Sequence, residues 1–88
     1  MSGILRVDYR GADIRVEAEP ESARLFINGI QREAVAGNGE VRLQSSVKTD
    51  YEWHEWVEAI INRQDGNLSI ALYSNNTLVA QESFTDPT

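Results

Sequence analysis

Cysteine is absent from the 88 residues, and histidine occurs once, at His54. The lack of a cysteine thiol excludes disulfides, thiolate metal sites and a cysteine nucleophile. No run of 18 apolar residues occurs, and the first residues have neither the basic start nor the apolar stretch of a signal peptide. We therefore expect a cytoplasmic protein with no membrane partner and no cofactor.

The composition is that of one small globular domain. Apolar residues make up 41% of the chain and charged residues 25%, a usual balance for a folded protein. We expect residues 1–88 to form a single domain, with residues 85–88 disordered. Because a chain of this size buries only about 60–65% of its unfolded surface, nearly every apolar residue is needed in the core.

The net charge of −6 is unevenly distributed along the chain. Seven basic and seven acidic residues cancel over residues 1–48, whereas residues 49–88 hold Arg63 alone against seven acids. Four of these acids fall between positions 50 and 58. Because neutralising phosphates is the main source of affinity for DNA and RNA, this charge disfavours a nucleic-acid partner.

Five short strands are predicted in the first half of the chain. Apolar and polar residues alternate there, as in strands with one buried side; the runs are residues 5–10, 13–19, 24–27, 30–35 and 41–48. Pro20 ends the second run because it has no amide proton for a ladder. Asn28-Gly29 is typical of a type I′ hairpin turn.

The period changes after Thr49, and a helix is predicted over about residues 50–63. Thr49-Asp50-Tyr51-Glu52 has the form of a capping box. An apolar stripe at the helical period follows, made of Trp53, Trp56, Val57, Ile60 and Ile61. A bent strand is the alternative for this segment.

A last hairpin is predicted from residues 68–73 and 77–84, around Asn75-Asn76. Leu25–Asn28 and Leu72–Asn75 look alike, but hairpins formed by the same local rules look alike in any case, so we infer no duplication. The predicted order is therefore βββββαββ. This is an α+β fold, in which a seven-stranded antiparallel meander curves around one amphipathic helix.

Trp53 and Trp56 are expected to fill the space between this helix and the sheet. Trp56→Ala would then destabilise the domain by about 3–5 kcal/mol. An unchanged melting temperature would instead place Trp56 in solvent and favour a binding role for it.

Enzyme chemistry has little support in the sequence. Asp50, His54 and Glu58 at i, i+4 and i+8 could face a divalent metal from one side of a helix, but the second histidine of a specific motif is missing. No serine lies in a nucleophile elbow, and no glycine-rich phosphate loop is present. We predict no enzyme activity, no catalytic residue and no metal site.

Protein contact is the leading functional prediction. An open meander leaves edge strands that can pair with a second copy, giving a homodimer, or with an extended peptide. On the predicted helix, an acidic face would attract a basic partner; its residues are Tyr51, Glu52, Glu55 and Glu58. The alternatives are a small ligand in the mouth of a half-closed barrel near Trp53, and an acidic mimic of nucleic acid.

Overall fold

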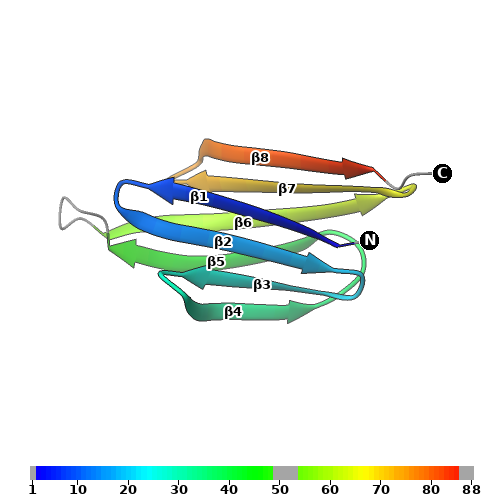
Figure 1. The fold of residues 1–88 in the computed structure, drawn as a ribbon, viewed down its shortest axis with the longest axis horizontal. Coiled ribbons are helices and arrows are strands. Elements are labelled where there is room, and N and C mark those ends of the chain that lie inside the picture. The colour runs from blue at the N-terminus through cyan, green and yellow to red at the C-terminus, as the bar shows by residue number, and fades with distance from the viewer. Residues whose placement is uncertain (1, 49–53, 86–88) are drawn as a thin grey trace.

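The computed structural model describes residues 2–48 and 54–85, which form two four-stranded antiparallel sheets (Figure 1). The first sheet has the order β1-β2-β3-β4 and the second β5-β6-β7-β8. Every strand pairs with the next one along the chain within its sheet. The strands are β1 (Gly3–Tyr9), β2 (Ala12–Glu19), β3 (Ser22–Ile27), β4 (Ile30–Ala36), β5 (Val41–Lys48), β6 (His54–Gln64), β7 (Asn67–Ser74) and β8 (Thr77–Thr85).

The predicted α+β fold with a helix at about 50–63 is wrong: the described residues are all-β, and β6 occupies most of that segment. The adjacent apolar pairs Trp56-Val57 and Ile60-Ile61 explain the error. Such pairs lie together on a helical stripe, but in a strand they point to opposite faces. β6 pairs with β5 and with β7, so its residues complete the second sheet. The proposed capping box lies outside the described residues.

The core lies between the two sheets, which cover each other's inner faces. The inner positions of β2 and β6 show the alternation, with Ile14 and Val16 facing Val57 and Ile61 in one buried cluster. This is the usual arrangement of a β-sandwich, in which each sheet buries the apolar face of the other. Each sheet covers the apolar face of the other, which is the role expected of the predicted helix.

Both sheets are assembled in the same way. In each, the ladder between the third and fourth strands carries a register shift, after Leu25 in the first sheet and after Leu72 in the second. In each, an asparagine with positive φ follows the third strand. Its side-chain oxygen accepts a hydrogen bond from an amide of the second strand: Asn28 from Asp13 at 2.9 Å, and Asn75 from Trp56 at 3.4 Å.

The backbone N–H groups of the two asparagines also donate hydrogen bonds to the same second-strand residues. The Asn28 N–H donates to the Asp13 carbonyl at 2.7 Å, and the Asn75 N–H donates to the Trp56 carbonyl at 3.0 Å. The two sheets therefore share their strand order, the position of their register shift and this asparagine contact. The likeness of the two short sequence segments, from which we inferred no duplication, reflects this shared construction.

Arg63 ties the sheets together at one end of the sandwich. It is an inner residue of β6, and its guanidinium donates to three backbone carbonyls from the other side of the molecule. Nη2 donates to Glu19 at 2.6 Å and to Ser22 at 2.9 Å, while Nη1 donates to Gly39 at 3.2 Å. One side chain thus holds the β2–β3 turn and the β4–β5 connection against β6.

Candidate interaction surface

The four residues of the predicted acidic face are not grouped on a helix. Tyr51 and Glu52 lie outside the described residues. Glu55 points into the sandwich and is 8% exposed, whereas Glu58 lies on the outer face of β6. A strand turns residues 55 and 58 to opposite faces. Whether any of the four contacts a partner stays a prediction.

Glu55 belongs to a buried polar cluster. Its Oε1 accepts a 2.9 Å hydrogen bond from Arg10 Nη1, and the Tyr9 hydroxyl lies 3.5 Å away, too far for a full hydrogen bond. Its Oε2 and the Ser74 hydroxyl on the adjacent strand are both buried without a hydrogen-bond partner. The Arg10 pair compensates the buried charge, so this carboxylate is structural in character.

His54 is exposed at the start of β6. It shares the outer face with Glu58, but four residues of extended strand separate them by about 13 Å. Both cannot ligate one ion at that separation. Within residues 2–48 and 54–85, no three His, Asp or Glu side chains are placed to hold a metal.

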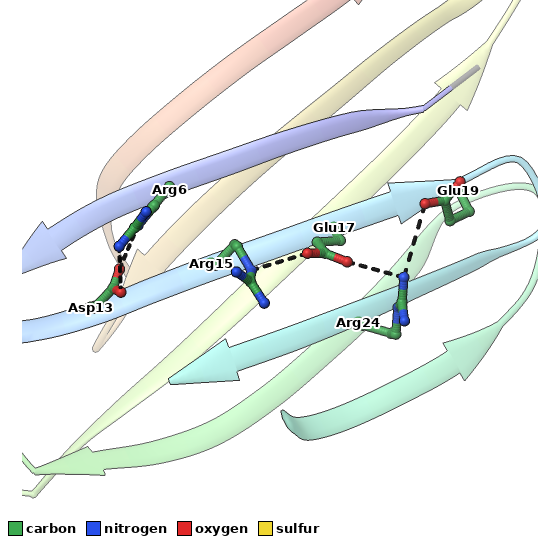
Figure 2. Close-up of polar contacts among 6 residues, drawn as sticks. All are labelled: Arg6, Asp13, Arg15, Glu17, Glu19 and Arg24. Atoms are coloured by element: carbon green, nitrogen blue, oxygen red, sulfur yellow. Dashed lines mark hydrogen bonds and ion pairs between the residues drawn. The ribbon is translucent and has the colours of Figure 1, made fainter. Parts of the chain in front are cut away.

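The outer face of the first sheet is covered by a ladder of ion pairs, shown in Figure 2. Arg6 on β1 forms two hydrogen bonds with the Asp13 carboxylate on β2, at 2.9 and 3.0 Å. These bonds, more than the charges of Arg6 and Arg15, hold the pKa of the Asp13 carboxyl below its ordinary value of 3.8.

The ladder continues along β2 to β3. Arg15 pairs with Glu17 at 3.0 Å, and Glu17 pairs with Arg24 at 3.0 Å (Figure 2). Arg15 and Arg24 also lie over the ring of Phe26, at 4.3 and 5.8 Å from its centre. The one outward aromatic ring of this sheet is therefore covered by its own arginines. Acids that alternate with arginines in this way do not form the continuous surface that a nucleic-acid mimic requires.

The outer face of the second sheet is different, because its exposed apolar side chains lie next to one another on neighbouring strands. Trp56 on β6 is 50% exposed and Leu78 on β8 is 49% exposed. Tyr73 on β7 lies directly opposite Leu78 and diagonally opposite Trp56, and Ile60 follows on the same side of β6. We call these four residues the Trp56 face. The prediction that Trp56 is buried in the core is therefore wrong.

Few charges border the Trp56 face. Among the outward residues from Arg42 to Ser46 and from Trp56 to Ser83, only Arg42 and Glu58 are charged, and they lie 3.9 Å apart. The rest are neutral, including Gln44, Asn62 and Gln81. The cation–π contacts of the described residues are confined to Tyr9 and Phe26, so no arginine covers Trp56 or Tyr73.

The sheet edges carry features that oppose strand addition. On β5, the Arg32 side chain donates to the Ser46 carbonyl at 3.4 Å and the Glu33 carboxylate accepts from the Gln44 amide at 2.5 Å. These two consecutive side chains both reach β5 because the register shift in β4 re-aims one of them. The backbone of β5 is thereby partly satisfied, and β4 itself carries the bulge.

The other two edges are also modified. β8 has its own bulge, and Glu82 lies opposite the core residue Ile70, so a paired strand would bury its charge. On β1, the Phe84 ring covers Gly3 so closely that an added Cβ would lie 2.6 Å from Phe84 Cε1. Edge contact stays a prediction, but these features give it less support than the Trp56 face has.

The buried side chains of both sheets form one cluster between them. Two hollows of about 380 and 290 Å³ lie around the β6–β7 turn. Turn residues such as Gln64, Asp65 and Asn67 line both. Trp53, near which the ligand alternative was placed, lies outside the described residues.

Comparison with known proteins identified no relative: no family model, curated protein or solved structure matches the chain. Within the described residues, no helix long and apolar enough to cross a membrane is present.

Proposed function

We propose that this protein acts by binding another protein through the Trp56 face and has no enzymatic activity of its own. The observation that carries the proposal is the half-exposed indole of Trp56 on a nearly neutral sheet face. Aromatic side chains are enriched at the centres of protein interfaces, whereas charged residues are depleted there. Phe26, the outward aromatic residue of the first sheet, is covered by arginines and offers no such surface.

The positions of the apolar residues support the same surface. Trp56, Tyr73 and Leu78 come from three consecutive strands and are neighbours in the sheet register. Hydrogen bonds to Asn75 hold the Trp56 backbone from the β7–β8 turn. Because the sheet fixes the backbone of these residues, little order has to be created when a partner binds.

The test is affinity capture from the native cell extract with the immobilised chain and its Trp56→Ser variant. We expect the variant to lose the captured protein at least tenfold, with a change in unfolding free energy below about 1.5 kcal/mol because Trp56 is half in solvent. Ile4→Ser is the matched control, since Ile4 is 58% exposed on the outer side of the first sheet. Equal capture by all three chains would refute the proposal.

A further inference from the structure

We propose that the partner of the Trp56 face is a second copy of this chain, bound across a twofold axis with the two faces opposed. The inference rests on the proposed function, because it names the occupant of the same surface. A twofold contact needs one self-complementary patch, and the outer face of the second sheet has the charge, shape and size for it.

The charge distribution favours a second copy. The chain carries −6, so two copies repel each other across most orientations. The Trp56 face is bordered by Arg42 and Glu58, and at the β5 edge by Arg32 and Glu33, so the cations and anions around it balance. Opposing these faces places a neutral surface against a neutral surface, which limits repulsion between like molecules.

The surface shape of the Trp56 face and of the strands beside it is also self-complementary. Trp56, Tyr73 and Leu78 project at one end, near the β7–β8 turn. Small side chains follow on β7 and β8, where Ala71, Ser69 and Ser83 leave a lower surface. A twofold rotation sets the projecting end of one copy over the low end of the other, and the second contact is then formed by symmetry.

The size meets the lower limit for a specific dimer. Four strands about 4.8 Å apart, each about eight residues of 3.3 Å, cover about 500 Å². Two such faces bury about 1,000 Å², which is the minimum for a biological interface and is typical of weak, transient ones. A contact of this size predicts a reversible dimer whose population depends on protein concentration.

Sedimentation equilibrium of the purified full chain over a wide concentration range tests the proposal. Gln81→Glu adds a charge on the outer side of β8, so each dimer would gain two opposed acids. Ala34→Glu is the matched control, because Ala34 occupies the corresponding position after the bulge of β4 and the change in net charge is the same. We expect the unmodified chain to form a dimer. Gln81→Glu should raise its dissociation constant at least tenfold, and high salt should reverse this effect. Ala34→Glu should leave the dissociation constant unchanged.

Two results would overturn the inference. A monomer at every concentration would exclude the second copy, while Trp56-dependent capture of a different protein would still support the proposed function. A dimer that both variants weaken equally would place the contact elsewhere, for example at a sheet edge. Loss of capture in the Trp56→Ser variant without any self-association therefore separates failure of this inference from failure of the proposed function.

Discussion

At the scale of single residues, Arg63 is the side chain with the widest structural role. Its three acceptors are backbone carbonyls at positions 19, 22 and 39, which belong to segments that no strand ladder joins to β6. Its Nε is buried without a hydrogen-bond partner. Because all three acceptors are backbone carbonyls, these hydrogen bonds depend on the planar, forked geometry of the guanidinium.

Arg63→Met should therefore destabilise the fold by about 2–4 kcal/mol, because three carbonyls lose charged donors at once. Lysine at this position restores the charge but not the fork, so it should recover only part of the loss. Urea unfolding followed by tryptophan fluorescence measures the effect.

Arg42→Met provides the control for Arg63. The Arg42 side chain is 58% exposed and forms only surface ion pairs with Glu40 and Glu58. Its loss should cost less than about 1 kcal/mol. Equal costs for the two variants would show that the contacts of Arg63 are not structural.

The role of Arg63 could not be predicted from the sequence. In the sequence it is the only basic residue of the expected helix and stands at its C-terminal end, where a cation is favourable for that reason alone. Its true partners lie 24 to 44 residues away, so they become neighbours only when the sheets face each other. The burial of Glu55 and the exposure of Trp56 could not be predicted either, because both depend on which face of β6 turns toward the first sheet.

At the scale of elements, Asn28 and Asn75 make equivalent contacts in the two sheets. Asn28 and Asn75 both have positive φ, at 52° and 49°, and both bond a backbone amide of the second strand of their sheet. The Asn28 bond is shorter, 2.9 Å against 3.4 Å. Because N–H···O hydrogen bonds ordinarily span about 2.7–3.2 Å, the Asn28 bond is the stronger of the two.

Asn28→Ala should cost about 1–2 kcal/mol, because alanine loses the hydrogen bond and also strains at positive φ. Asn28→Gly should cost less, since glycine tolerates this backbone and loses only the bond. The same pair of changes at Asn75 should have smaller effects. Thermal unfolding of the four variants tests this ranking, and a larger loss at Asn75 would contradict it.

The strands of the first half could be predicted because their signal is local. Alternation in residues 13–19 and the Asn28-Gly29 turn depend on neighbours within a few positions, and the structure has strands and a turn there. β6 could not be predicted in this way. Its inner row begins with Glu55, and its outer row contains Trp56 and Ile60, so the period of two is hidden until β5 and β7 fix the faces.

At the scale of the whole molecule, the candidate surface is a property of the second sheet. Residues 49–88 hold the entire excess of negative charge, yet their outer sheet face is nearly neutral. Asp65 lies in a turn, Glu82 is on the inner side of an edge strand, and Glu55 is buried. A count of charges along the chain could not find this face, because it is formed by residues from four strands.

Because the two sheets cover each other, the structure also predicts whether each half of the chain can fold alone. Each sheet is a complete meander, but its apolar face is covered only by the other sheet. A single four-stranded sheet with one apolar face in water cannot offset the entropy of ordering its chain. The connection between the halves is short and glycine-containing, and among its hydrogen bonds the one that joins it to β6 comes from Arg63 to Gly39.

Fragments 1–38 and 39–88 should therefore each be unfolded alone and should fold when mixed in equal amounts. Arg63 would still reach the carbonyls of Glu19 and Ser22 across the break, and Arg32 and Glu33 would still bond the edge of β5. Cooperative thermal unfolding, followed by near-ultraviolet circular dichroism, should appear only in the mixture and should shift upward with concentration, since association replaces a covalent link. A fragment that melts cooperatively as an isolated monomer would show that one sheet is stable without the other, and the mutual covering of the two sheets would then not be what holds this fold together.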